Sequence, residues 1–538
     1  MAACCAPAFV LIAASDGYDL VIRHGRIIDG TGSPAVEGDI AVRDGRITAI
    51  GNVSGRGRIE IDARGRVVAP GFIDVHTHAE DIDELPMAEN FLRMGVTTLV
   101  TGNCGSSKTD IAALFRKLEE VRIAPNIATL IGHNSVRLEA MGGSFDRPPT
   151  PAELDRMCQI VDVAMRDGAI GLSTGLIYLP GTFAKANEVV ALAKVAAAHG
   201  GVYASHLRYE NARILEALAE FTDVAREAVI PAQVSHIKLS GPSAWGRADE
   251  ILAFLDRARA GGLVVTQDQY VYTAASAGIG SRIPEEAREG GRDRYRERIA
   301  DPVQKAAFVA DMKATLERNR QPDYGFVVIA NFEPDPRLNG KTIPEAARIL
   351  RGSDSIEDQI ETILDLEARG GAQGVFHGIH EGDLQRFLAD PRTMIASDSG
   401  IRKFQDGVPH PRGYGNNARV FGRYVRELKL LTLEEAVRRM TSLPAKAFHL
   451  RDRGELRIGA FADIAVFDPE AVADPSTFED PHHYAIGFND VIVNGVPVIR
   501  DGELTGARPG VPVRRQPGHL TPFSKMKLQS VLRFSCPG

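Results

Sequence analysis

The chain has 538 residues, of which 44% are hydrophobic and 25% are charged, and its formal net charge is −7 at pH 7. This length exceeds one typical domain, so we expect a large domain with at least one smaller module. The composition is that of a globular protein and excludes a fibrous or disordered chain. The negative charge provides no basic face for nucleic acid or an anionic membrane. No run of residues approaches the roughly 18 apolar residues of a membrane-spanning helix.

The first 17 residues are an N-terminal extension whose apolar segment resembles a signal-peptide core, but no Lys or Arg precedes Arg23. Without that positive flank we expect a cytoplasmic protein, with export as the alternative. The cysteines support a reducing compartment, because an odd number scattered over a long chain is not a disulfide framework. They are Cys4, Cys5, Cys104, Cys158 and Cys536.

Short alternating strands with turns lie at both ends of the chain. The first stretch runs from Tyr18 to Val68, and similar strands recur at Ala462–Asp468 and Asp490–Arg500. Alternation of apolar and polar residues over such short runs is typical of half-buried strands. We predict that residues 18–69 and 452–514 pair into one small β-sandwich. The tail from 515 to 538 has no recognisable pattern.

Between these ends, eight short apolar runs alternate with longer helical stretches. This alternation predicts a (β/α)8 barrel over residues 70–451 rather than an open parallel sheet. A charged, helical stretch from 281 to 372 interrupts the rhythm, and we interpret it as an insertion after the seventh strand that forms a lid. The eight expected strands are Gly71–Val75, Val96–Thr101, Asn126–Ile131, Ala169–Leu172, Gly201–Ala204, Ala232–Val234, Gly262–Val265 and Met394–Ala396.

Metal-ligand residue types stand where these strands end. His76 and His78 follow the first strand and are two residues apart, so on an extended strand both side chains face the same way and can bind one metal. A lone pair of this kind is more often a surface feature. Here the chain also places Cys104, His206, His236 and Asp398 at other strand ends. The C-terminal mouth of a barrel is where active-site residues gather, so the sequence predicts a metal site there.

With these residues in place, the chain resembles the N-acyl-D-amino-acid deacylase (D-aminoacylase) family of the amidohydrolase superfamily. The resemblance covers nearly everything from Tyr18 to about Arg514. It includes Gly171-Leu-Ser-Thr-Gly-Leu-Ile-Tyr-Leu-Pro-Gly, Pro409-His-Pro-Arg-Gly-Tyr-Gly and Thr441-Ser-Leu-Pro-Ala-Lys. It implies zinc-dependent hydrolysis of the amide bond of an N-acyl-D-amino acid, with a small molecule as the partner.

The resemblance also implies roles for the candidate residues. Cys104, His206 and His236 would hold one tightly bound Zn²⁺, and His76 and His78 would line a second, weaker position. A thiolate suits zinc better than Mg²⁺ or Ca²⁺. Many amidohydrolases bridge two metals with a lysine on the fourth strand, but residues 169–180 contain no lysine. This absence fits a bridging role for the cysteine.

Asp398 would accept the proton of the attacking water and deliver it to the leaving nitrogen, as the family implies. Arg412 matches the family's carboxylate-binding arginine, and a guanidinium can bind that group through two hydrogen bonds. Tyr272 and Ser276 match positions that add hydroxyl donors, although Val271 stands where the family usually has proline. Lys238, two residues beyond His236, could bind substrate, meet an acidic side chain or be solvated. The loop between the aspartate and the arginine is longer than the family's, which leaves substrate choice open.

Two other functions compete with this interpretation. A cyclic-amide hydrolase of the hydantoinase or dihydroorotase type would share the barrel, the His-x-His pair and the aspartate, but would normally use the missing lysine. A scaffold that kept the barrel without the chemistry would usually lose metal ligands, and here all six expected positions are filled. The sequence does not fix the acyl group, the amino-acid side chain, the number of metals or the oligomeric state.

Overall fold

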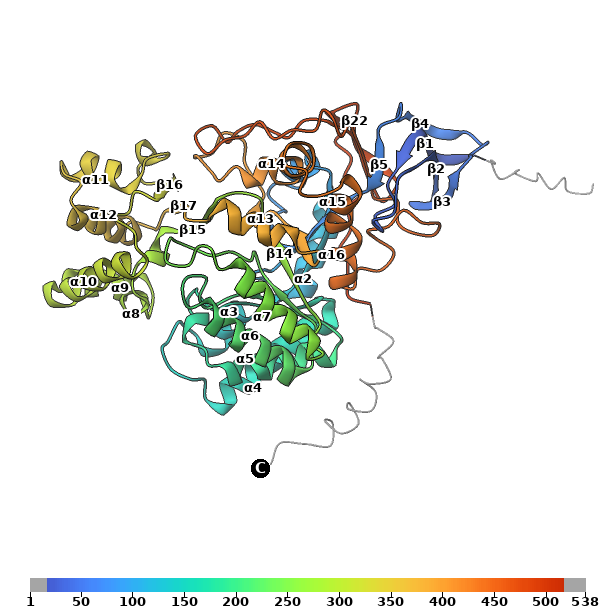
Figure 1. Ribbon diagram of the computed structural model, residues 1–538. Coiled ribbons are helices and arrows are strands. Elements are labelled where there is room, and N and C mark those ends of the chain that lie inside the picture. The colour runs from blue at the N-terminus through green and yellow to red at the C-terminus, as the bar shows by residue number, and fades with distance from the viewer. Residues whose placement is uncertain (1–16, 517–538) are drawn as a thin grey trace, which may run out of the picture.

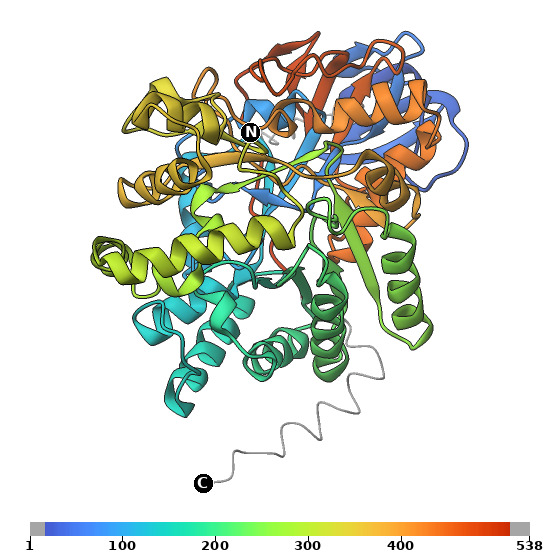
Figure 2. The same cartoon turned by 60° about the vertical axis from the view of Figure 1, so that its left-hand side comes forward.

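The computed structural model describes residues 17–516, and Figures 1 and 2 show its arrangement. The N-terminal extension and the C-terminal tail predicted above lie almost entirely outside the described residues. Within residues 17–516, no helix has both the length and the apolar character needed to cross a bilayer.

Eight parallel strands form the barrel, and seven of them overlap closely with the predicted runs. Most successive pairs are joined by a parallel ladder. A backbone bond from Ile170 N to the Thr129 carbonyl links the third strand to the fourth. The ring closes where β19 (Ser399–Gly400) pairs with β7 (Thr77–His78). The barrel strands are β6 (Phe72–Asp74), β8 (Val96–Thr101), β9 (Asn126–Thr129), β11 (Gly171–Gly175), β12 (Val202–His206), β13 (Ala232–Val234), β14 (Val265–Gln269) and β18 (Thr393–Ile395).

The seventh strand lies later in the chain than predicted, because β14 begins where the predicted run ends. Its residues Gln267, Asp268 and Gln269 look like a polar loop in the sequence, yet all three are buried. Gln267 donates to Thr393 Oγ1 at 2.9 Å, and Asp268 accepts hydrogen bonds from Gln233 and the backbone of His236. Polar groups with such partners can be buried inside a barrel at little cost.

Helices cover the outside of the barrel, as βαβ connections require. Their apolar faces pack on the strands in the largest hydrophobic cluster of the molecule. The covering helices are α1 (Glu89–Leu92), α2 (Ile111–Val121), α3 (His133–Met141), α4 (Pro151–Asp167), α5 (Ala186–Ala198), α6 (Ile214–Ala228), α7 (Ala248–Ala260), α13 (Glu381–Ala389), α14 (Arg412–Arg419), α15 (Leu433–Met440) and α16 (Ser442–Ala447).

Strands from both chain ends share one nine-stranded sheet. The junction is the antiparallel pair of β5 and β20, so residues 400 positions apart lie side by side. We propose that this sheet is the small module predicted for the two ends. Its strands are β1 (Tyr18–Ile27), β2 (Val36–Arg43), β3 (Arg46–Gly51), β4 (Gly57–Asp62), β5 (Val67–Pro70), β20 (Ile464–Phe467), β21 (Phe488–Val493), β22 (Val496–Arg500) and β23 (Glu503–Leu504).

The insertion after the seventh strand has a hydrophobic core of its own, separate from that of the barrel. In Figure 1 its helices project from one side of the barrel, away from strands β1–β4. A three-stranded sheet of order β15-β17-β16 joins it to the barrel mouth. Its elements are β15 (Ala274–Gly278), α8 (Glu285–Arg288), α9 (Arg292–Ala300), α10 (Pro302–Arg318), β16 (Val327–Asn331), α11 (Ile343–Arg351), α12 (Ile356–Ala368) and β17 (Gln373–His377).

Candidate metal centre and active site

A cavity of about 1090 Å³ opens at the C-terminal ends of the barrel strands. Its lining includes five of the predicted site residues, namely His78, Cys104, Ser276, Asp398 and Arg412. The insertion contributes further lining residues from β16 and β17. A concave site with convergent polar groups at this end of a barrel is the expected place for chemistry.

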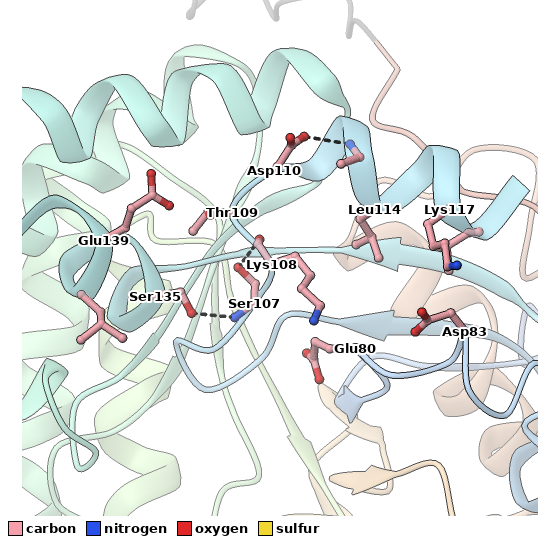
Figure 3. Close-up of a pocket in the computed structure, with 13 residues that line it drawn as sticks. Glu80, Asp83, Ser107, Lys108, Thr109, Asp110, Leu114, Lys117, Ser135 and Glu139 are labelled. Carbon is pink, nitrogen blue, oxygen red and sulfur yellow. Dashed lines mark hydrogen bonds between the residues drawn. The ribbon is translucent and has the colours of Figure 1, made fainter. Parts of the chain in front are cut away.

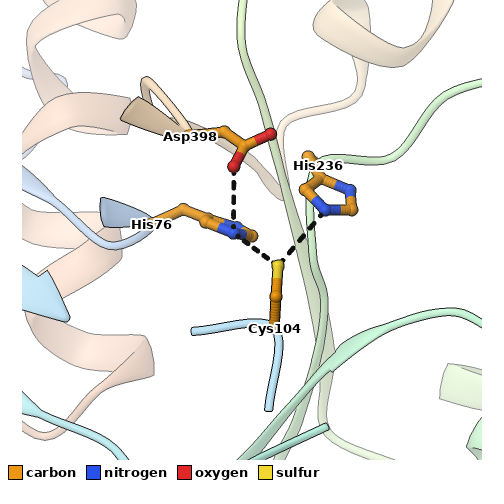
Figure 4. Close-up of side chains that lie close together, drawn as sticks. All are labelled: His76, Cys104, His236 and Asp398. Carbon is orange, nitrogen blue, oxygen red and sulfur yellow. Dashed lines mark hydrogen bonds and ion pairs between the residues drawn. The ribbon is translucent and has the colours of Figure 1, made fainter. Parts of the chain in front are cut away.

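At the base of the cavity, four potential metal ligands from four strand ends converge (Figure 4). The ligand atoms of His76, Cys104, His236 and Asp398 all lie within 4.8 Å of one another, and all four residues are buried. His76 Nε2 lies 3.2 Å from Cys104 Sγ and 3.5 Å from Asp398 Oδ1. His78 reaches the same carboxylate, with Nε2 at 3.2 Å from Asp398 Oδ1.

The three residues predicted to hold the tight zinc form a compact triangle. Cys104 Sγ lies 3.5 Å from His206 Nδ1 and 3.6 Å from His236 Nε2. Tetrahedral zinc with its usual bond lengths places sulfur and nitrogen ligands about 3.6 Å apart. The two imidazole nitrogens are 2.8 Å apart, somewhat closer than the roughly 3.3 Å of a tetrahedral pair. Because one thiolate and two imidazoles are ligands that zinc prefers, these residues fit the metal after a small separation of the two rings.

Backbone strain accompanies this convergence. Cys104, His236 and Asp398 have φ angles of 52°, 33° and 51°, in the left-handed region that side chains rarely adopt. Each such residue costs on the order of 1–3 kcal/mol, and strain of this kind is concentrated at functional sites. Gly175 allows the close approach of the strand ends, since a Cβ there would lie 2.0 Å from the Cys104 carbonyl oxygen. The sharp turns bring all three side chains into one ligand cluster, and two of them, Cys104 and Asp398, also line the cavity.

The charges of the cluster favour a thiolate among imidazoles. Burial alone would raise the pKa of Cys104, but the charge of His76 and hydrogen bonds from His206 and His236 hold it well below its ordinary value. Burial and the neighbouring His236 lower the pKa of His206, although Glu210 opposes them. Metal ligands must be a thiolate and neutral imidazoles, so these two shifts favour coordination. Burial and Lys238 would lower the pKa of His236, but Asp398 and Glu210 outweigh them and raise it, so protons compete more strongly with a metal at this ring.

Carboxylates behind the cluster orient the imidazoles. Asp268 Oδ1 lies 3.3 Å from His76 Nδ1 and accepts the backbone N–H of His236 at 2.9 Å. Glu210 Oε1 lies 3.1 Å from His236 Nδ1. Such contacts fix the ring orientation and tautomer of a metal-binding histidine.

Lys238 also stands in this outer layer. Its Nζ pairs with Glu210 and lies 2.9 Å from His236 Nδ1, and the residue is only 4% exposed. Lys238 does not line the cavity. Of the three roles that the sequence allows for it, the structure shows the contact with an acidic side chain.

Asp398 lies between the metal ligands and a buried guanidinium. Its Oδ2 is 2.8 Å from Arg412 Nη1, and Arg412 is 2% exposed. Burial would raise the pKa of Asp398, but Arg412, His236 and His76 hold it well below its usual range. The aspartate is therefore ionised and able to accept a proton.

Arg412 begins α14 and is held from two sides. Its backbone N–H donates to His410 Nδ1 at 3.0 Å, and His410 Nε2 contacts the Ala274 carbonyl at 2.9 Å. The guanidinium carbon lies 4.5 Å from the centre of the Tyr270 ring. Within the described residues, Arg412 Nε has no hydrogen-bond partner. An unpartnered buried N–H beside a cavity is suited to bind an anionic group.

The two predicted hydroxyl donors have different surroundings. Ser276 is on β15 and lines the cavity. Tyr272 does not line it, and its hydroxyl donates to Asp474 Oδ2 at 2.6 Å. Only Thr273 separates Tyr272 from β15, and the Tyr272 side chain contacts Asp474 instead of lining the cavity. Its role in binding substrate stays a prediction.

Sequence reasoning missed several residues around the centre. Glu210 comes four residues after His206, a spacing that could have indicated a paired carboxylate. Asp268 is an acidic residue among the polar residues of the seventh strand, beyond the predicted end of that strand at Val265. Tyr178 packs edge-on against His206 with ring centres 4.7 Å apart. Arg402 lines the cavity from the long loop after Asp398.

A second cavity of about 570 Å³ lies beside the first, against α2 and α3 (Figure 3). Its polar walls include Glu80, Asp83, Lys108 and Lys117. Two of its lining residues, Ser135 and Leu138, also line the larger cavity. It contains none of the converging ligands in Figure 4.

Comparison with known proteins connects this geometry to a family. Residues 60–499 match the model of the amidohydrolase family. The chain is 34% identical to a D-aminoacylase and 35% identical to an N-acyl-D-glutamate deacylase, both from Alcaligenes xylosoxydans xylosoxydans. The first match covers 92% of this chain and 97% of the relative, and the second covers 93% and 96%.

A solved structure gives the same picture. The N-acyl-D-glutamate deacylase of Bordetella bronchiseptica, crystallised with zinc and a phosphonate mimic of the tetrahedral intermediate, superposes with a TM-score of 0.80 at 34% identity. The match covers 93% of this chain and all of that one. The similarity of fold therefore extends over most of the chain.

Proposed function

The chain belongs to the amidohydrolase family, and from this premise we propose that it is a zinc-dependent enzyme that hydrolyses N-acyl-D-amino acids. The products are a carboxylic acid and a free D-amino acid. One observation carries the proposal: a buried arginine, Arg412, stands beside the metal-ligand cluster and contacts Asp398. An amide substrate that also carries a carboxylate matches this pairing of a metal centre with a cationic anchor.

We propose that Cys104, His206 and His236 hold one tightly bound zinc ion, with His76 and His78 beside a second, weaker position. Bound zinc supplies Lewis acidity, which polarises a carbonyl and lowers the pKa of water. Cys104 contacts ligands on both sides of the cluster, since its sulfur lies near His76 as well as His206 and His236. These contacts support a role for Cys104 as the ligand that would serve both positions.

Asp398 and Arg412 carry out the remaining steps. The Asp398 carboxylate accepts a proton from the attacking water and then donates it to the nitrogen that leaves. Arg412 binds the substrate carboxylate and so fixes the scissile amide over the cluster. Ser276 adds a hydroxyl from β15. Asp268, Glu210 and Lys238 orient the histidines from behind and do not meet the substrate.

The competing interpretations have less support. A cyclic-amide hydrolase of the hydantoinase or dihydroorotase type would need the bridging lysine, and β11 (Gly171–Gly175) contains none. A scaffold without chemistry would have no need for three strained residues that bring ligands into one cluster.

Turnover of N-acetyl-D-methionine, N-acetyl-L-methionine and hydantoin by the zinc-loaded protein tests the proposal. We expect hydrolysis of the D-substrate to exceed that of the other two. Hydantoin as the best substrate, or no turnover of any N-acyl amino acid, would refute it.

A further inference from the structure

A second arginine, Arg402, faces the cavity that contains Arg412, and it has almost no partners. The residue is half-buried, and its Nε donates to Ser399 Oγ at 3.2 Å. Among residues 17–516, no carboxylate forms an ion pair with it, and its two terminal nitrogens have no hydrogen-bond partner. These nitrogens are not among the buried polar atoms, so they are open to the cavity and can donate to an anion that enters it.

The two guanidinium groups belong to one corner of the cavity. A Cβ on Gly413, the residue after Arg412, would lie 2.8 Å from Arg402 Nε. The Arg402 side chain therefore lies along the backbone that carries Arg412. Burial and the charge of Arg412 together lower the pKa of Arg402 to about 10. The guanidinium is still charged at neutral pH. Asp398 and Asp81 oppose the lowering of its pKa, but Asp398 forms its ion pair with Arg412 and not with Arg402.

The loop that carries Arg402 is fixed by contacts at several points. The backbone N–H of Arg402 donates to Asn90 Oδ1 at 3.2 Å, and that of Gln405 donates to His482 Nδ1 at 3.1 Å. Further along, Val408 N donates to the carbonyl of Ala330 in the insertion at 2.7 Å. A side chain on such a supported loop is positioned before substrate arrives, which reduces the entropy lost on binding.

We propose that Arg402 is a specificity-determining residue that binds a second carboxylate, so that the preferred substrates are N-acyl derivatives of acidic D-amino acids. This inference rests on the proposed function. The α-carboxylate of the substrate binds Arg412. A side-chain carboxylate on the same amino acid is then within the corner where Arg402 has free N–H groups.

Acidic residues also line the cavity, and they define the rival substrate. Asp81, Glu84, Glu333 and Asp406 are exposed, whereas Arg402 is half-buried and Arg412 is buried. Exposed charges are hydrated and screened by salt, and they contribute little to binding. The less exposed arginines therefore determine which charge the inner cavity accepts. If the exposed acids dominated instead, N-acyl derivatives of D-lysine would be preferred.

The test compares substrates whose side chains differ in charge, and the glutamate and glutamine side chains also match in shape. In the zinc-loaded wild type, kcat/KM for N-acetyl-D-glutamate should exceed that for N-acetyl-D-glutamine and N-acetyl-D-lysine. Arg402→Gln should lower the value for the glutamate substrate about 10–100-fold, the size expected for a charge-assisted contact. It should change the value for the glutamine substrate less than about threefold, which is under 1 kcal/mol. Arg402→Lys should restore part of the loss.

Lys403→Gln is the matched control, because Lys403 also lines the cavity and carries the same charge but is exposed, so its charge is hydrated. It should lower the glutamate preference far less than Arg402→Gln. Thermal unfolding and zinc content of both variants must match the wild type. Equal losses on the glutamate and glutamine substrates would overturn the inference, as would a wild-type preference for the D-lysine substrate. A loss confined to N-succinyl-D-methionine, whose second carboxylate is on the acyl group, would also overturn it. Failure to hydrolyse any N-acyl-D-amino acid would instead refute the proposed function.

Discussion

Asp398 and Arg412 form an ion pair at the edge of the metal-ligand cluster, with 2.8 Å between Oδ2 and Nη1. The other carboxylate oxygen, Oδ1, faces His76 and His78. The residue that we propose to transfer protons, Asp398, is thus paired directly with the residue that we propose to bind the substrate carboxylate, Arg412. A bound substrate carboxylate must share or replace this pair, so anchoring and proton transfer are coupled through a single contact.

Asp398→Asn should leave zinc bound and lower kcat strongly. The amide keeps the size of the side chain but cannot accept and return a proton. General acid–base catalysis is typically worth about 10²–10⁴ in rate. Zinc content measured beside kcat separates this effect from loss of the metal, and a near-normal kcat would mean that another residue moves the proton.

Cys104→Ser should release zinc and abolish activity together, because the thiolate contacts ligands on both sides of the cluster. Metal analysis after dialysis measures retention. Cys158→Ser is the matched control, since Cys158 is on α4, outside the ligand groups. If the Cys104 variant kept one zinc per chain and full turnover, the proposed tight site would be wrong.

The insertion should act as a lid on the cavity. It has its own hydrophobic core, and its residues Ala330, Asn331 and Glu333 line the site. A unit with a separate core can move as a body. Hydrogen exchange in residues 281–372 should slow when a phosphonate analogue of an N-acyl-D-amino acid binds, while exchange in β1 and β2, on the far side, stays unchanged. Equal exchange with and without the analogue would argue against a lid.

The sequence predicted most of the site because ligand positions follow from strand ends. Once eight apolar runs are recognised as barrel strands, the residues at their C-terminal ends are expected to meet at the barrel mouth. These residues include Cys104, His206, His236 and Asp398. The contact of Tyr272 with Asp474 could not be predicted, because the two residues lie 202 positions apart in the sequence. The position of Arg402 could not be predicted either, because contacts with residues distant in the sequence hold its loop.

Polar residues limited the fold prediction in the same way. Asp268 belongs to the seventh strand, yet hydrophobic pattern alone assigns it to a loop. Only its buried partners, Gln233 and the backbone of His236, make a carboxylate acceptable inside the barrel. Those partners belong to the neighbouring sixth strand and its end. The hydrophobic pattern of the seventh strand therefore could not predict them.

Glu188 should be important for stability rather than for chemistry. It is 2% exposed and joins α5 to α3 through His133 Nε2 at 2.8 Å and Arg137 Nη1 at 2.6 Å. Burial opposes its charge, but His133 and Arg137 lower its pKa. A lowered folded-state pKa contributes stability above the unfolded value of about 4.3, and this contribution disappears as pH falls through the folded value.

Glu188→Gln should therefore destabilise the protein at pH 7 by about 3–5 kcal/mol, because it leaves a buried arginine without its anion. Urea unfolding at pH 7 and near pH 4 measures the effect, which should shrink at the lower pH. Glu139→Gln should change little. Glu139 is an exposed partner of Arg156 and is on α3, the helix that also carries His133 and Arg137. Equal stability of the Glu188 variant and the wild type at pH 7 would show that the network is dispensable.

Arg412 provides the sharpest test of the substrate class. Removing an arginine that binds a carboxylate in a buried site should cost about 1.5–3 kcal/mol, or roughly 10–150-fold in kcat/KM. Arg412→Lys should restore only part of this, because an ammonium lacks the planar pair of donors. Arg412→Ala also frees Asp398 from its ion pair, so a general loss of rate would not identify the anchor. The comparison that does is between N-acetyl-D-methionine and its uncharged carboxamide. If Arg412 binds the carboxylate, the alanine variant loses far more on the acid than on the amide, because only the acid makes the missing contact. Equal losses on both would show that the arginine supports the loop and Asp398 instead, and would favour the cyclic-amide hydrolases again.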